Sequence, residues 1–320
     1  MKTYSGLSGS PGIVIGPIWV YRPQKIEFQV KNIENCEAEE GRLETAFQKT
    51  NEQLSELEEK TRVEIGDHEA DIFSAHQAIL ADPTLKKRII DNIEKNTWNA
   101  EPAVELAIQE IAQEFEKLED EYFRARAIDI RDIGQRLLRN LLGITEALDN
   151  FPNQPVILLA EELTPSDTVR FDKSHILGLA TIKGGPTSHT AILARSMGIP
   201  AIVSLNAPLK DLENVSNAIM NGEVGQIITS PDKQTLAQTL DEKSKLANLQ
   251  AKQFKRSQEA AVTSDGYEVK IAANIGNLLD AKSALEHGAI GVGLLRTEFL
   301  YLDSKSLPDE ATQATAYKAI

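Results

Sequence analysis

The spacing of apolar residues changes twice along this 320-residue chain, and that change constrains the fold more than any other feature. Residues 4–21 alternate glycines with β-branched and aromatic residues, which is typical of one or two short strands joined by turns. From about residue 34 to residue 142, apolar residues recur every three or four positions and predict four or five helices. Past residue 150 the pattern again predicts strands, at 155–160, 176–182, 199–205 and 225–229.

The order of these parts predicts an α/β domain that is interrupted by helices. Consecutive elements of a domain usually pack together, so we expect residues 1–21 and 150–230 to share one sheet. Residues 34–143 then form a helical bundle that is inserted between them. The predicted fold class is therefore α/β plus all-α.

Two further segments follow this domain. Ser230 is expected to cap, and Pro231 to begin, a polar linker helix within residues 231–261. Residues 266–320 then predict a strand, a helix and a strand, which is the repeating unit of a parallel sheet. A (β/α)8 barrel needs about 250 residues, so this segment can supply only the start of such a barrel.

Composition excludes several functions. The chain has 34 Lys and Arg against 48 Asp and Glu, a net charge of -14 and a pI near 4.9. An acidic surface repels the phosphates of nucleic acids and anionic membranes, so we expect neither as a partner. No apolar run approaches the ~20 residues that span a bilayer, and no signal peptide is recognisable. The single cysteine, Cys36, excludes an internal disulfide and indicates a reducing cytoplasm.

The densest local signal is KGGPTSHTAILARSMGIPAIV, residues 183–203, in which a strand meets two glycines and then a helix. Gly184 and Gly185 allow backbone conformations that are closed to other residues, and they allow a ligand to approach closely. Thr187 or Ser188 can cap the helix that follows. This arrangement predicts a loop that presents the start of a helix.

His189 is predicted in the first turn of this helix, which ends near Met197. The unpaired N–H groups and the dipole at this end of a helix favour an anion. A neutral imidazole is a competent nucleophile near pH 7, because its reference pKa is about 6.5. The pattern fits a histidine that carries a phosphoryl group; the alternative is a histidine that only packs or caps at the junction.

This segment resembles the phosphohistidine signature of phosphoenolpyruvate-using proteins, and the whole chain is similar, in the same order, to enzyme I of the bacterial sugar phosphotransferase system. The resemblance implies an enzyme that takes the phosphoryl group of phosphoenolpyruvate onto His189, on the ring nitrogen farther from the backbone. It then passes the group to a histidine of the phosphocarrier HPr. In LTPSDTVRF, residues 163–171, the resemblance places Thr168 beside the histidine in a hydrogen bond, whereas an ordinary helix-start residue is the alternative.

A second family signature resembles GVGLLRTEFLY, residues 291–301, and implies that Arg296 binds the phosphate of phosphoenolpyruvate. A guanidinium at the carboxyl end of a barrel strand suits an anion, and an ion pair with Glu298 is the alternative. The family's Mg²⁺ ligands, catalytic cysteine and dimer interface lie in barrel segments beyond these residues, so we expect no metal ligand here. We also expect little phosphoenolpyruvate turnover by these residues alone, and a homodimer only with the complete barrel.

The helical segment resembles the HPr-binding subdomain of the family. Residues 34–71 contain 13 acidic and 4 basic residues, a balance that usually marks a solvated helix face. Such charge also speeds association with a basic partner. Residues 67–80 resemble the family's docking helix, which implies Phe73 and His76 as contacts with HPr. Arg126 could face the partner or the sheet, and its spacing does not decide.

Two other functions share the histidine motif. Pyruvate phosphate dikinase and phosphoenolpyruvate synthase carry it on a mobile domain, but they need a nucleotide-binding domain upstream. The residues before the motif contain no glycine-rich nucleotide loop, which counts against both. A phosphocarrier or regulatory domain, in contrast, would exchange phosphate with HPr without using phosphoenolpyruvate.

Overall fold

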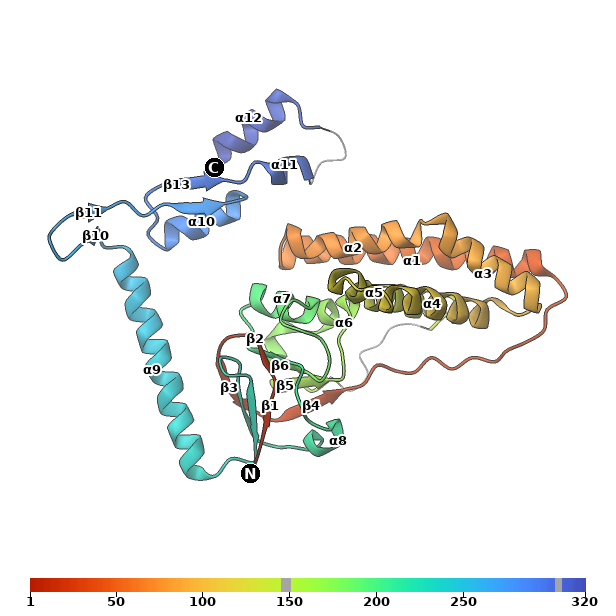
Figure 1. The fold of residues 1–320 in the computed structure, drawn as a ribbon, viewed down its shortest axis with the longest axis horizontal. Helices are drawn as coiled ribbons and strands as arrows, with labels where there is room; N and C mark the ends of the chain where they lie inside the picture. The colour runs from red at the N-terminus through yellow and green to blue at the C-terminus, as the bar shows by residue number, and fades with distance from the viewer. Residues whose placement is uncertain (145–150, 303–306) are drawn as a thin grey trace. The chain divides into compact units, whose positions relative to one another are not determined.

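Figure 1 shows a computed structural model that describes residues 1–144, 151–302 and 307–320. The expected domain boundary at residue 150 lies outside these residues. The chain divides into two compact units, Met1–Leu236 and Ala237–Ile320.

The first unit contains two sheets. A five-stranded sheet has the order β2-β7-β6-β5-β4, and its strands are β2 (Leu7–Ser10), β4 (Ile18–Tyr21), β5 (Val156–Ala160), β6 (Ile176–Thr181) and β7 (Ala201–Val203). Strands β4 to β7 are parallel, and β2 pairs antiparallel with β7. An antiparallel sheet of order β1-β9-β8-β3 is built from β1 (Lys2–Ser5), β3 (Ile13–Gly16), β8 (Ala218–Asn221) and β9 (Gln226–Thr229).

The N-terminal residues pair with the later strands, as expected, but they are split into more strands and more sheets than predicted. They form four short strands rather than one or two, and these strands enter two sheets rather than one. Gly12 lies between β2 and β3 with φ of +124°, a conformation that turns the chain from one sheet to the other. Strand β8 was not expected from the sequence, and it pairs with both β3 and β9.

Strand β5 crosses the centre of the α/β core. All five of its residues are buried, and alternate side chains enter two apolar clusters. Ile157 and Leu159 belong to one cluster, whereas Leu158 and Ala160 belong to the other. A continuous apolar run such as VILLA is typical of a parallel strand that is covered on both faces.

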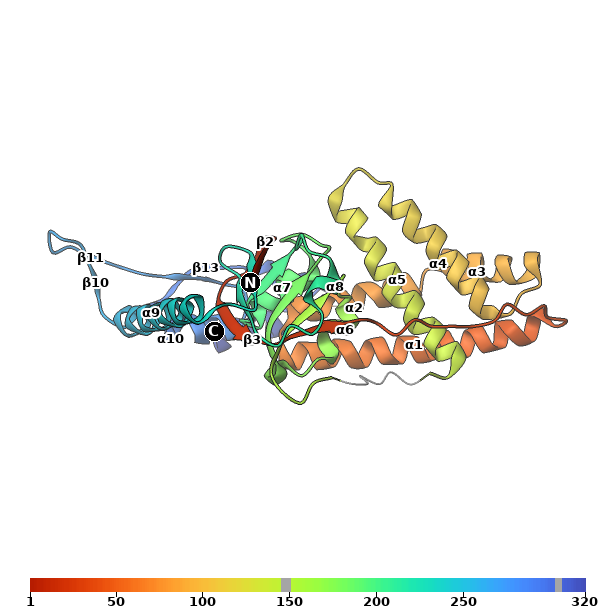
Figure 2. The same cartoon turned by 90° about the horizontal axis from the view of Figure 1, so that it is seen from below.

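The helical bundle between β4 and β5 consists of α1 (Cys36–Glu64), α2 (Asp67–Leu80), α3 (Pro83–Asn96), α4 (Ala100–Glu116) and α5 (Glu121–Leu142). Figure 2 shows these helices as one body, in which α1 packs on α2 and α4 packs on α5. Asp82 caps α3 by accepting from the Thr84 N–H at 2.7 Å, and Pro83 occupies its first position. Leu43, Phe73 and other apolar residues fill the bundle core.

Helix α6 (Pro165–Arg170) connects the bundle to the α/β layer, because it contacts α1, α5 and α7 (His189–Ser196). Its Val169 side chain packs into the core of the helical bundle. Thr164 and Asp167 form a capping box at its start. A 3₁₀ helix, η1 (Lys173–His175), and the short helix α8 (Leu209–Leu212) complete this unit.

Helix α9 (Lys233–Ser257) leads into the second unit. It begins later than predicted, because Ser230 takes a left-handed φ of 47° and Asp232 accepts from the Thr235 N–H at 2.8 Å instead. The second unit contains the hairpin of β10 (Ala261–Val262) and β11 (Glu268–Val269), followed by β12 (Ala273–Ile275), α10 (Leu278–Glu286), β13 (Val292–Leu295), α11 (Glu298–Leu302) and α12 (Glu310–Ala319). Strands β12 and β13 are parallel, as the predicted strand-helix-strand unit requires.

Candidate active site

His189 is the first residue of α7, which ends one residue before Met197. The Ser188 hydroxyl caps the helix by accepting from the Ala191 N–H at 3.4 Å. Of the two predicted capping residues, Ser188 is therefore the N-cap, and Thr187 is exposed in the loop before it. The imidazole is thus held where the free N–H groups of α7 favour negative charge.

The loop before α7 is tied down by backbone contacts. Gly184 has φ of +89°, which strains any other residue, and its carbonyl accepts from the Ser204 hydroxyl. The Gly185 carbonyl accepts the N–H of the N-cap residue at 2.9 Å. Arg195 donates to the Pro186 carbonyl, so this arginine has the structural role that links the helix to its own loop.

The His189 imidazole is partly enclosed, with 27% of its side chain exposed. Burial lowers the pKa of the ring below its ordinary value of 6.5. Asp129 and Asp132 oppose this shift, whereas electrostatic interactions with Arg126 and His76 add to it. At pH 7 the ring is therefore neutral and has one unprotonated nitrogen, as a nucleophile needs.

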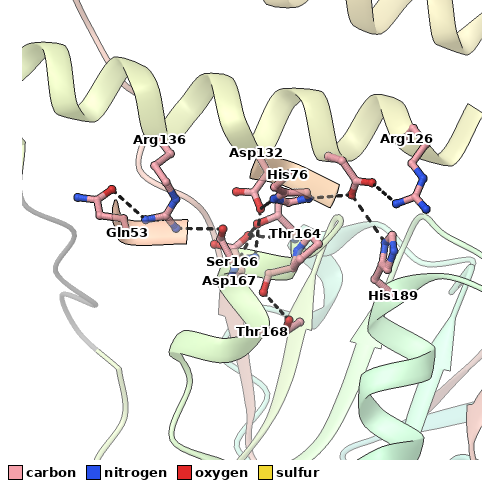
Figure 3. Close-up of polar contacts among 12 residues, drawn as sticks. Gln53, His76, Arg126, Asp132, Arg136, Thr164, Ser166, Asp167, Thr168 and His189 are labelled. Atoms are coloured by element: carbon pink, nitrogen blue, oxygen red, sulfur yellow. Dashed lines mark hydrogen bonds and ion pairs between the residues drawn. The ribbon is translucent and has the colours of Figure 1, made fainter. Parts of the chain in front are cut away.

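A line of titratable side chains runs from His189 into the helical bundle (Figure 3). Asp129 Oδ1, on α5, lies 3.9 Å from His189 Nδ1 and 3.3 Å from His76 Nε2. The other carboxylate oxygen, Oδ2, accepts from Arg126 at 2.9 Å. On the far side of the His76 ring, Nδ1 lies 4.0 Å from Asp132 Oδ2.

Asp129 is ionised in this setting. Its side chain is fully buried, and burial alone would raise the pKa of its carboxyl. Its interactions with His76 and His189, together with the hydrogen bond from Arg126, outweigh burial and lower the pKa of Asp129 below its ordinary value. A buried carboxylate therefore faces the imidazole on α7.

Asp132, the last residue of this line, is hydrogen-bonded to α6. The Ser166 N–H donates to Asp132 Oδ2 at 3.1 Å, and the Ser166 hydroxyl accepts from Arg136 at 3.0 Å. Arg136 also donates to Gln53 of α1 at 3.2 Å. These bonds tie α1, α5 and α6 together beside the candidate site (Figure 3).

Three family profiles match successive parts of the chain. They describe the N-terminal part, the mobile domain and the phosphoenolpyruvate-binding domain of phosphoenolpyruvate-utilising enzymes, and they match residues 5–126, 152–225 and 250–320. A structure titled as the NMR solution structure of an enzyme I protein shares 36% sequence identity with this chain and has a TM-score of 0.59. The match covers 76% of this chain and 99% of that structure. The chain belongs to the enzyme I family.

Curated enzyme I relatives are similar along the whole chain. A phosphoenolpyruvate-protein phosphotransferase of Priestia megaterium is 38% identical over 319 residues, which is 100% of this chain and 56% of the relative. One of Geobacillus stearothermophilus, with the same name, is also 38% identical and is covered over 55% of its length. The chain therefore spans little more than half the length of the curated relatives that it matches.

Thr168 has a different partner from the one that the enzyme I resemblance implied. Its buried hydroxyl donates to the Pro165 carbonyl at 2.8 Å, within α6. Among the described residues, His189 has no hydrogen bond from Thr168 or from any other side chain. The threonine completes the first turn of α6, as the alternative interpretation expected, and the group that faces the His189 ring is Asp129.

The prediction that Phe73 and His76 contact HPr is wrong. Both side chains are fully buried, so neither can meet a partner at the surface. Phe73 packs in the bundle core with its ring edge-on to His76. Residues three apart on a helix share a face, and this face of α2 is turned into the bundle, where α2 packs on α1 and α5.

Arg296 directly follows β13, with an exposed side chain, as the second signature predicted. Its N–H donates to the Ile275 carbonyl at 2.8 Å, which holds it at the carboxyl end of the parallel pair. No ion pair joins it to Glu298 among the described residues.

No group of three or more His, Cys, Asp or Glu side chains that could hold a metal is found within residues 1–144, 151–302 and 307–320. Over the same residues, no helix is both long and apolar enough to cross a membrane.

The sequence interpretation missed Asp129 and Asp132. The signal was present in ARAIDIRDIG, where Arg126, Asp129 and Asp132 are spaced by three and so lie on one face of α5. Buried charges are normally paired, and their partner here, His76, is distant in the sequence. Only the packing of α2 on α5 brings these groups together.

Proposed function

We propose that the chain carries the histidine step of a phosphoenolpyruvate-dependent sugar phosphotransferase system. His189 accepts the phosphoryl group of phosphoenolpyruvate and donates it to a histidine of HPr. The observation that carries this proposal is the partly exposed imidazole, neutral at pH 7, at the N-terminus of α7. The names of the curated relatives, which are phosphoenolpyruvate-protein phosphotransferases, support it.

The chemistry follows from the state of the ring. The lone pair on Nε2 attacks phosphorus, the N–P bond forms, and the bond from phosphorus to the leaving oxygen breaks with its electron pair. Such transfers depend on positioning and charge more than on covalent help from side chains. The loop of Gly184, Gly185, Thr187 and Ser188, together with the first N–H groups of α7, supports the negative phosphoryl group.

We assign phosphoenolpyruvate to the second unit. Residues 266–320 are proposed as the first part of a (β/α)8 barrel, which the parallel unit of β12, α10 and β13 supports. Arg296, at the carboxyl end of these strands, would bind the phosphate through its N–H donors. Mg²⁺ would neutralise phosphate charge in this reaction, but the described residues offer no set of ligands for it.

The helical bundle, residues 34–143, is proposed as the docking surface for HPr, and residues 1–21 and 150–230 as the phosphohistidine domain. The acidic excess of residues 34–71 supports docking of a basic partner. The contacts would come from exposed residues around the buried face of α2. Residues 231–261 are the proposed linker to the barrel.

The alternative function is a phosphocarrier or regulatory domain that exchanges phosphate with HPr alone. The names of the relatives favour the complete reaction. Since both functions share the exchange between His189 and HPr, that exchange is the step to test first.

The test is transfer of label from phosphorylated HPr to the chain. The native chain should take up label, and His189→Ala should take up none. His175→Ala is the matched control, because His175 is another histidine of the α/β layer, with 35% of its side chain exposed. Full labelling of His189→Ala, or equal loss in both variants, would overturn the proposal.

A further inference from the structure

One carboxylate oxygen, Asp129 Oδ1, lies between two imidazoles of opposite accessibility. It is 3.3 Å from the buried His76 and 3.9 Å from the partly exposed His189. Among the described residues, Asp129 is the one carboxylate within 4.0 Å of a His189 ring nitrogen. The nitrogen that it faces is Nδ1.

The position of Asp129 is fixed from within the bundle. Arg126 donates to its Oδ2 at 2.9 Å from the same helix, and His76 meets its Oδ1 from α2. His76 is itself placed between two carboxylates, because its Nδ1 lies 4.0 Å from Asp132 Oδ2. Asp132 is anchored by the Ser166 N–H of α6. The Arg126 hydrogen bond to Oδ2 and the His76 contact thus hold Oδ1 on the side of His189.

We infer that Asp129 is a positioning residue for phosphoryl transfer at His189, because it keeps the proton on Nδ1 and so leaves the Nε2 lone pair free for attack. This inference rests on the proposed function and deepens it. The tautomer of a histidine is set by the partner of its other ring nitrogen, and a carboxylate selects an N–H on the side that it faces. At 3.9 Å the pair is beyond hydrogen-bond length, and the carboxylate acts on the Nδ1 side of the ring electrostatically.

The carboxylate also balances the charge that the transfer creates. When Nε2 forms the N–P bond, the ring gains a positive charge that is shared with Nδ1–H. The leaving oxygen departs with the electron pair of the broken P–O bond, and no proton has to leave the ring. Asp129 stabilises the imidazolium in place, and in the reverse direction this charge makes the ring a better leaving group. Thr168 does not supply this function, since its hydroxyl hydrogen is donated to Pro165.

The test is the tautomer of His189, read by ¹⁵N NMR of the histidine rings in the full chain at pH 8. The native chain should show a protonated Nδ1 and an unprotonated Nε2. Asp129→Asn should shift the ring toward the Nε2–H form, because the amide no longer selects an N–H at Nδ1. The matched control is Asp211→Asn, the same substitution at a carboxylate that pairs with Lys2 outside the helical bundle.

The second readout is the rate of labelling by phosphorylated HPr. Asp129→Asn should slow labelling by about tenfold or more, Asp129→Glu should restore part of the rate, and Asp211→Asn should leave it unchanged. Thermal unfolding of each variant separates loss of positioning from loss of fold.

An Nε2–H tautomer in the native chain overturns the inference whether or not any variant folds. So does an Asp129→Asn chain that folds, keeps the Nδ1–H form and takes up label at the native rate. Failure of the proposed function has a different signature, in which the native chain takes up no label while the ¹⁵N spectra still report the tautomer.

Discussion

His76 and His189 lie on either side of the same carboxylate oxygen, and they differ in almost every other respect. His76 is fully buried on α2, between the carboxylates of Asp129 and Asp132. His189 begins α7, is 27% exposed, and has one carboxylate at 3.9 Å. The first imidazole is enclosed between two carboxylates inside the bundle, whereas the second remains partly accessible to solvent.

The difference teaches that the residue type does not decide the role of a histidine. His76 is enclosed by helix packing, so it can interact only with the side chains packed around it. His189 is held by a loop and a helix terminus, and its lowered pKa leaves it neutral at pH 7. The helical bundle thus supplies fixed charge, and the α/β layer supplies the reacting group.

The largest expected effect separates the two histidines by stability. His76→Leu leaves the buried Asp129 without its imidazole partner, so we expect a loss of about 3–5 kcal/mol in the free energy of unfolding. His189→Ala removes a partly exposed ring with one charged neighbour, and we expect a change of about 1 kcal/mol or less. Urea unfolding followed by circular dichroism measures both. Equal losses would remove the distinction between the two sites.

A smaller effect tests whether the loop holds His189 in place. Gly184→Ala puts a side chain at φ of +89° and should cost about 1–2 kcal/mol while slowing phosphoryl exchange. Gly185→Ala is the matched control, because its φ is not positive and an added Cβ would meet nothing within 4 Å. If both variants behave alike in urea unfolding, the loop geometry is not what presents the ring.

The smallest effect is a shift in the titration of His189. Because burial lowers the pKa of the folded ring below 6.5, the unfolded chain binds the proton first as the pH falls. This group therefore reduces stability as the pH drops from 6.5 toward the folded pKa. Asp129→Asn removes a charge that raises the pKa of His189, so the NMR titration midpoint should move further down. A midpoint above 6.5 in the native chain would contradict this environment for the ring.

Much of the fold could be predicted because its signals are local. The helical spacing of residues 34–142 and the buried run VILLA each reflect one element and its own periodicity. The start of α7 was predictable for the same reason, since a capping serine and two glycines lie beside His189 in the sequence.

The line of titratable side chains formed by Asp129, His76 and Asp132 could not be predicted, because it depends on which faces of α2 and α5 meet. His76 and Asp129 belong to different helices, and the sequence around each gives no sign that the two side chains meet. For the same reason the sequence did not reveal that Phe73 and His76, predicted as surface contacts, are buried. Short strands were also undercounted, since four-residue strands broken by glycines leave little periodicity to detect.

The central claim is that one imidazole at the start of α7 carries a phosphoryl group. The most direct measurement is to incubate the chain with phosphorylated HPr and locate the added group by intact mass and ³¹P–¹⁵N NMR. We predict a single phosphoryl group on Nε2 of His189. A chain that stays unmodified, or that carries the group on another residue, would contradict the account.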